Sequence, residues 1–103
     1  MMHQRKSLIG MLKQLREDML AIQQLGAGYY SCTPIIVRYN KLLEHAKHLA
    51  PSDTNGLVAT FDPIAEEDPL DPGEKMKVVQ GIRIEIGQLL SLLETGSDED
   101  DAE

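Results

Sequence analysis

Two histidines, His45 and His48, stand one helical turn apart and could do metal chemistry. Side chains three residues apart share a helix face, and Glu44 and His3 are the further ligands that the sequence offers. Zinc sites use three or four protein ligands, and di-iron bundles repeat a Glu-x-x-His motif on paired helices. The residue three after Glu44 is Lys47, and only one helix supplies this pattern. We therefore expect a solvated helix face, with no metal and no cofactor.

A second candidate for chemistry is Cys32, which is the only cysteine in the sequence. It stands just before a predicted helix N-terminus, a position that favours a thiolate and therefore a nucleophile. A catalytic cysteine also needs a base, and His45 and His48 lie roughly three to four turns further along the same helix. We expect Cys32 to pack as a small residue, and Tyr29 or Tyr30 to close the end of the helical domain. No other grouping suggests catalysis, so the sequence predicts a protein that is not an enzyme.

Acidic residues gather before the last predicted helix, where they could bind calcium: Asp62, Glu66, Glu67, Asp68, Asp71 and Glu74. Calcium requires several oxygens that converge from a tight loop, and the Asp-x-Asp-x-Asp-Gly pattern of such loops is missing here. Three prolines also stiffen this stretch. We expect a solvated segment in which Asp71 and Glu74 cap the helix that follows.

The first element that positions these groups is a helix predicted over residues 3–25. Its apolar residues recur at alternating spacings of four and three, which is typical of a helix that packs against other helices. The members of this stripe are Leu8, Leu12, Leu15, Met19 and Ile22. Gly26 is the expected stop, because glycine adopts the left-handed conformation that ends many helices.

A second helix is predicted over residues 34–50, and a short connection makes it the antiparallel partner of the first. Thr33 is the expected N-cap, and Pro34 suits the first helical position, where its missing N–H is tolerated. Tyr39 should pack in the core with its hydroxyl hydrogen-bonded. Pro51 ends this helix, because the residue before a proline avoids the α region. The apolar stripe repeats as Ile35, Tyr39, Leu42, Ala46 and Leu49.

Residues 51–71 form a connection that is long for a compact domain and therefore demands a structural reason. Asn55-Gly56 is a turn signal, and the prolines argue against a long helix. We expect a crossover segment whose acids stay in water and whose apolar residues pin it to the helices. The pinning residues should be Leu57, Val58, Phe61, Ile64 and Leu70. A functional loop is the alternative.

A third helix is predicted over residues 72–95, with Asp71 as N-cap and Glu74 closing a capping box. Its apolar residues sweep an arc of roughly 160°, which is more than one neighbouring helix can cover. The helix is therefore either central to the fold or shared with a second subunit. Since two-fold dimers are the commonest oligomers, we expect dimerisation through this helix. The predicted interface residues are Val79, Ile82, Ile86, Leu89, Leu90 and Leu93.

The net charge of −7 is divided unevenly along the chain. Residues 1–52 hold seven Lys or Arg and three acids, whereas residues 53–103 hold three basic residues and fourteen acids. We expect these halves to attract each other, within the chain or across a dimer. Direct nucleic-acid binding is not expected, because an Arg-rich run and stacking aromatic residues are missing.

Neither a secretory signal nor a membrane span is expected, because Lys13 and Arg16 interrupt the apolar stretch that follows the first residues. A single cysteine forms no internal disulfide, so the sequence favours the cytoplasm.

Together these patterns predict an all-α fold, a three-helix antiparallel bundle over residues 1–96 followed by a flexible acidic tail, 97–103. The leading functional hypothesis is a non-enzymatic protein-interaction module, a self-associating adaptor or regulatory subunit with an unknown protein partner. One alternative is a helical bundle that binds a small molecule or a metal. Another is a regulator of a nucleic-acid-processing machine that uses the basic hairpin and the acidic tail.

Overall fold

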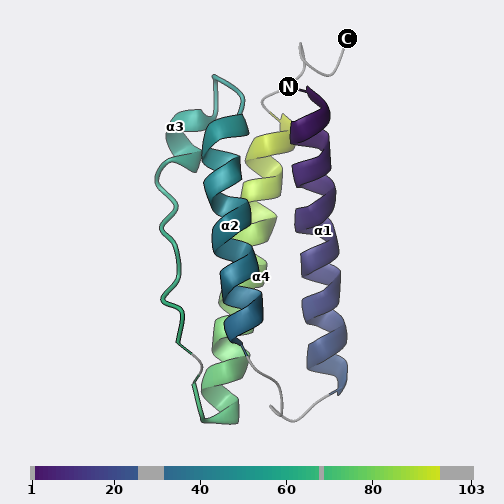
Figure 1. The fold of residues 1–103 in the computed structure, drawn as a ribbon, viewed down its shortest axis with the longest axis vertical. Coiled ribbons are helices and arrows are strands. Elements are labelled where there is room, and N and C mark those ends of the chain that lie inside the picture. Colours follow the sequence, from purple (N-terminus) through teal and green to yellow (C-terminus); the bar gives the residue numbers. More distant parts are fainter. Residues whose placement is uncertain (1, 26–31, 68, 96–103) are drawn as a thin grey trace.

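The computed structural model describes residues 2–25, 32–67 and 69–95, and it contains helices but no strand among them. Three long helices lie side by side, α1 (Met2–Leu25), α2 (Thr33–Leu49) and α4 (Pro72–Thr95) (Figure 1). The short helix α3 (Asn55–Val58) follows α2. The all-α prediction is confirmed, and each long helix begins and ends within one residue of the predicted position.

The directions of the long helices follow from which ends lie together. α1 runs opposite to α2 and α4, whereas α2 and α4 run the same way (Figure 1). At the start of both parallel helices, the Cys32 thiol donates to the Lys75 carbonyl oxygen at 3.8 Å. Beyond the end of α2, the Thr54 hydroxyl donates to the Leu92 carbonyl oxygen of α4 at 3.1 Å. The predicted antiparallel arrangement therefore holds for α1 against α2 and α4 but not between α2 and α4, which run parallel.

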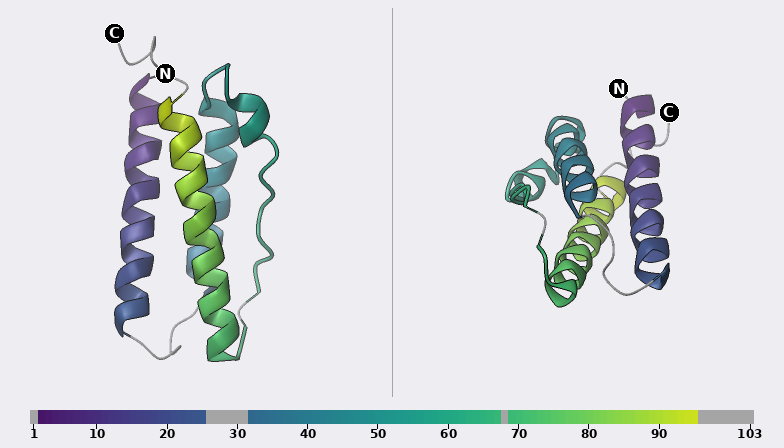
Figure 2. Two further views of the ribbon diagram at one scale, coloured as in Figure 1. Left: turned by 180° about the vertical axis from the view of Figure 1, so that it is seen from behind. Right: turned by 60° about the horizontal axis from the view of Figure 1, so that its bottom comes forward.

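Residues 59–71, here called the strap, make this parallel pair possible by returning along the molecule from α3 to the start of α4. The strap lies on the side of α2 that faces away from α1 (Figure 1, Figure 2). The Asn40 amide nitrogen donates to the Ile64 carbonyl at 2.8 Å, and the Ile64 N–H donates to the Asn40 side-chain oxygen at 2.9 Å. One side chain of α2 therefore pairs with the strap backbone as a neighbouring strand would.

Three of the five residues expected to pin this connection do so. Val58 is buried, and Phe61 and Ile64 pack partly buried against the core. Leu57 is 58% exposed and Leu70 is 94% exposed, so the prediction was wrong for these two. A single helical turn buries only one of its sides, and α3 uses Val58 for that side. Leu70 lies in the bend that leads into α4.

Helix ends follow mostly from local chemistry. At the start of α4, the Glu74 N–H donates to the Asp71 carboxylate at 3.1 Å, which confirms Asp71 as the N-cap. Pro51 ends α2 as expected, with Ala50 in extended backbone. At the other end of α2, the predicted N-cap was wrong by one residue. The helix already includes Thr33, and Cys32 is the N-cap without a side-chain cap bond.

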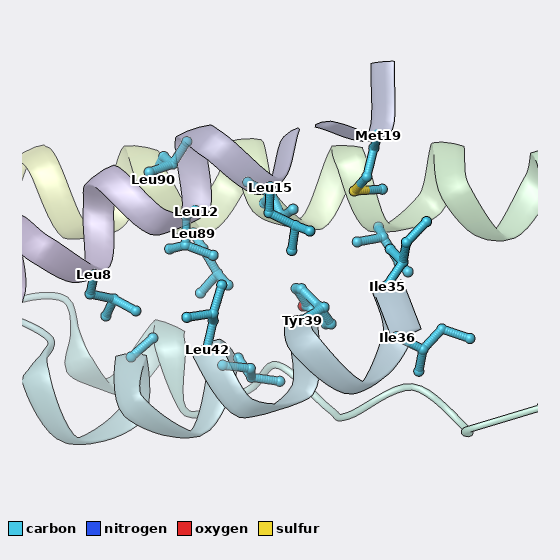
Figure 3. Packing of buried hydrophobic residues seen from close by; sticks show 14 of the residues in the cluster. Leu8, Leu12, Leu15, Met19, Ile35, Ile36, Tyr39, Leu42, Leu89 and Leu90 are labelled. Carbon is cyan, nitrogen blue, oxygen red and sulfur yellow. The ribbon is translucent and has the colours of Figure 1, made fainter. Parts of the chain in front are cut away.

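The core between α1, α2 and α4 is almost entirely aliphatic (Figure 3). Side chains from α1 and α2 interdigitate with α4 there, as expected for helix-on-helix packing. The buried residues of the first two helices are Leu8, Leu12, Leu15, Met19, Ile35, Ile36, Tyr39, Leu42, Leu43 and Ala46. Within the described residues, none of the helices is long and apolar enough to cross a membrane.

Some sequence predictions fall outside the described residues. They concern the stop at Gly26, the roles of Tyr29 and Tyr30, the acid Asp68, the side chain of His3 and the acidic segment 97–103.

Candidate functional site

The six residues predicted to form a dimer interface lie in the core of the single chain. Five are fully buried and the sixth is 3% exposed: Val79, Ile82, Ile86, Leu89, Leu93 and, last, Leu90. α4 contacts α1, α2 and α3, so its wide apolar stripe is covered by neighbours within the chain. The stripe therefore needs no second subunit to hide it, and these six residues are not a surface on which a partner could dock.

A groove of about 590 Å³ opens between α1 and α2. Its floor is apolar, with Leu8 and Leu42 buried and Leu49 partly buried, while Met11 is 46% exposed. Sites for small ligands usually measure roughly 300–1,000 Å³. The groove is thus large enough to hold several apolar side chains of a binding partner.

A row of basic side chains from α2 forms one wall of this groove: Arg38, Lys41, His45 and His48. Their spacings of three, four and three residues place them on one face of α2 over about 15 Å. The wall from α1 carries the neutral polar residues Gln4 and Ser7. Among the described residues that line the groove there is no carboxylate. The groove therefore has an apolar floor, one cationic wall and one neutral wall.

The two ends of the groove differ in charge. At one end, the Arg5 guanidinium of α1 donates to the Leu49 carbonyl in the last turn of α2, at 2.9 Å. This contact joins the two helices and supplies a cation where the carbonyl groups of a helix C-terminus lack helical partners. At the other end, a smaller hollow is lined by Arg38 of α2 and by Asp18 of α1, whose carboxylate accepts from Gln14 at 2.9 Å. A carboxylate therefore lies next to the Arg38 end of the basic row, and none lines the rest of it.

The two histidines that the sequence singled out belong to this row of basic side chains. His45 and His48 are exposed on the groove wall, whereas Glu44 and Lys47 line a separate hollow beside the strap. Over the described part of the chain, no group of three or more His, Cys, Asp and Glu side chains is arranged to hold a metal ion. Sequence reasoning missed the row itself, although its heptad-like spacing on α2 was a signal that could have found it.

Cys32 lies away from the groove lining. Its side chain is fully buried, as predicted for a small packing residue, and Lys75 beside it is 8% exposed. As the only cysteine of the sequence, Cys32 forms no disulfide within the chain.

Tyr39 is fully buried in the core, as predicted, but its expected hydrogen bond is not formed. The hydroxyl has no hydrogen-bond partner among the described residues. Burial raises the pKa of the Tyr39 phenol well above its ordinary value, and the negative charge of Glu85 raises it further. Tyr39 packs into a core that is almost entirely aliphatic and so offers few hydrogen-bond partners (Figure 3).

Comparison of the chain with protein-family models, with curated proteins and with solved structures found no match. The fold and the groove define a small helical protein with one amphipathic, cationic surface groove.

Proposed function

We propose that this chain is a non-enzymatic protein-interaction module, a small adaptor or regulatory subunit. The supporting observation is the groove between α1 and α2, which joins an apolar floor to a row of basic side chains. Apolar surface with a polar rim is typical of protein-interaction sites. The strap lies on the other side of α2, so no described part of the chain covers this groove (Figure 1). A cytoplasmic setting belongs to the proposal and is supported by the single, buried cysteine, Cys32.

Site-specific photo-crosslinking in the native cell tests this proposal. Met11 on the groove and Leu20 on the same helix are similarly exposed, at 46% and 41%. Their separation of nine residues turns them about 180° apart around α1. We expect a photoreactive phenylalanine at position 11 to crosslink a discrete protein, and the same residue at position 20 not to crosslink that protein. The proposal fails if neither position, or both equally, yields the product.

A small ligand or a metal ion in the same groove is the second candidate function. Its support is the groove volume and the two histidines on the wall, although zinc sites usually take three or four protein ligands. Metal analysis of untagged protein and calorimetric titration with Zn²⁺ test the metal version. A stoichiometry near zero in the first and no heat in the second reject it.

We also propose that the chain self-associates as a two-fold dimer through the outer face of α4. The support is Ile84, a large apolar side chain on α4 that is 60% exposed. Sedimentation equilibrium should show a dimer that Ile84→Asp weakens, whereas Leu20→Asp on α1 should leave it intact. A monomer at all concentrations, or an unaltered dimer in the Ile84 variant, contradicts this proposal.

A further inference from the structure

We infer that the groove binds an acidic amphipathic helix of about three turns, whose carboxylates lie along the cationic wall. This inference rests on the proposed interaction function and names the chemistry of the partner. It specifies three properties that can be tested separately, namely the helical form, the negative charge and the flank on which that charge lies.

The helical form follows from the two helices that build the groove. α1 and α2 are an antiparallel pair of helices with two sides. On one side of this pair, α4 packs against both helices. The open groove lies on the same pair of helices and offers the same kind of apolar ridges, with Leu8 and Met11 from α1 facing Leu42 from α2. Packing of ridges into grooves makes a further helix the natural occupant. The row of basic side chains from Arg38 to His48 extends over about 15 Å, which is the length of ten helical residues, and the charges of Arg38 and Lys41 lie at one end of it.

The negative charge follows from the walls. Arg38 and Lys41 carry full positive charges, and the described lining contains no carboxylate, although Asp18 lines the adjoining hollow together with Arg38. A basic partner would place like charges together over an apolar floor, which opposes binding strongly. Because Gln4 and Ser7 make the α1 wall neutral, the partner needs carboxylates only on the flank that faces α2.

The strap shows that the same chemistry already covers the other side of α2. Phe61 and Ile64 pack against the core while the neighbouring acids Asp62 and Glu66 stay exposed. Glu66 and Lys47 of α2 line the same hollow. An apolar segment with acidic residues is therefore what α2 accepts within its own chain.

A nucleic acid fits this groove less well. Phosphates need cations and gain little from an apolar floor, and here only one wall is cationic.

The test is a titration of the full ¹⁵N-labelled chain, followed by NMR, with designed 14-residue peptides. The first peptide places Leu at helical spacing with Glu along one flank. The second carries Lys in place of every Glu, and the third has the composition of the first in scrambled order. A short DNA duplex serves as the fourth probe. We expect the first peptide alone to shift amide resonances of residues 4–11 and 38–49, with a Kd between roughly 10 µM and 1 mM.

A matched pair of variants locates the charge. Lys41→Glu and Lys47→Glu change the same helix by the same charge, at exposed positions on the groove side and the strap side. We expect Lys41→Glu to weaken binding of the acidic peptide about fivefold or more, and Lys47→Glu to leave it within about twofold. Circular dichroism and unfolding curves verify that both variants are folded.

Several outcomes overturn the inference. They are equal binding of the basic or the scrambled peptide, stronger binding of the DNA duplex at the same residues, shifts confined to another face, and equal effects of the two lysine variants. A protein that crosslinks at position 11 while the acidic peptide fails to bind refutes the acidic helix but leaves the interaction function standing. If position 11 crosslinks no protein, the proposed function itself fails.

Discussion

The two sides of α2 both carry apolar and basic side chains, but only one of them is covered by another part of the chain. On one side, the strap lies over apolar residues and is held by the paired hydrogen bonds between Asn40 and Ile64. On the other side, apolar residues of α1 and α2 form the floor of a groove that no described residue covers. An apolar stripe alone therefore does not identify a docking surface. The stripe is available to a partner only where no other segment of the same chain packs over it.

The comparison extends to α4, whose stripe looked like the best interface in the sequence. That stripe is covered by α1, α2 and α3, whereas the less apolar groove stays open. The leucine-rich stripe of α4 is thus buried in the core. The groove between α1 and α2, which combines apolar and basic side chains, stays accessible.

Truncation of the α4 stripe should cause the largest loss of stability. Leu89→Ala leaves a cavity in the core and should lower the free energy of unfolding by about 2–5 kcal/mol, measured in urea. Gln80→Ala, at an exposed position of the same helix, should change it by no more than about 0.5 kcal/mol. A small loss for Leu89→Ala that varies with protein concentration would instead return this stripe to a subunit interface.

Release of the strap should have the next largest effect. Asn40→Ala leaves the Ile64 N–H and carbonyl without their partner, and should cost about 1–3 kcal/mol of unfolding free energy. Hydrogen exchange at the Ile64 amide should become faster, while exchange in α1 should change only as the global stability does. The control is Asn55→Ala in α3, at an exposed position. Unchanged protection of the Ile64 amide would show that the apolar contacts alone hold the strap.

Tyr39, in the core face of α2 between these two sides, gives a pH-dependent prediction. Burial raises the pKa of its phenol in the folded state, so above about pH 10 the unfolded state releases a proton that the folded state keeps. The free energy of unfolding should therefore fall by about 1.4 kcal/mol per pH unit as the pH rises from that point toward the folded-state pKa.

Tyr39→Phe should remove this loss, and at pH 7 it should leave stability unchanged or up to about 1 kcal/mol higher, because the hydroxyl has no hydrogen-bond partner to lose. Urea unfolding of both proteins at pH 7 and pH 11 measures the difference and cancels the other groups that titrate. An equal loss of unfolding free energy between pH 7 and pH 11 in both proteins would mean that Tyr39 ionises freely in the folded protein.

The ion pair between α1 and α4 should contribute least. Lys13 Nζ lies 3.0 Å from the Glu94 carboxylate, and both side chains are about half exposed, at 48% and 45%. A double-mutant cycle with alanine at both positions should give a coupling of no more than about 1 kcal/mol. Salt at 1 M should abolish it, since the Debye length is then about 3 Å. A larger, salt-resistant coupling would mean that this side too is clamped.

Local chemistry was predictable where it acts within one turn. Asp71 and Pro72 announced the start of α4, and Pro51 announced the end of α2, because caps and prolines act on their immediate neighbours. Thr33 misled by one residue, since the proline that follows it is tolerated at either of the first two helical positions. Helix positions therefore needed no knowledge of the fold.

The candidate site was only half visible in the sequence. His45 and His48 drew notice as metal ligands, but their significance comes from sharing a wall with Arg38 and Lys41. That wall borders a groove only because α1 lies beside it, and Arg5 joins the two helices at one end. The hydroxyl of Tyr39 was misjudged for a related reason, because its surroundings come from three different helices.

The helices, their apolar stripes and the spacing of the basic side chains on α2 can all be derived from the sequence. Each of them depends only on the 3.6-residue period of one segment. Three features became visible only in the tertiary structure. α2 and α4 run parallel, the strap covers one side of α2, and the apolar stripe of α4 is buried by the other helices of the chain. These outcomes depend on contacts between residues tens of positions apart, such as Asn40 with Ile64 and Thr54 with Leu92. Periodicity tells which face of a helix is apolar, and packing alone tells what covers it.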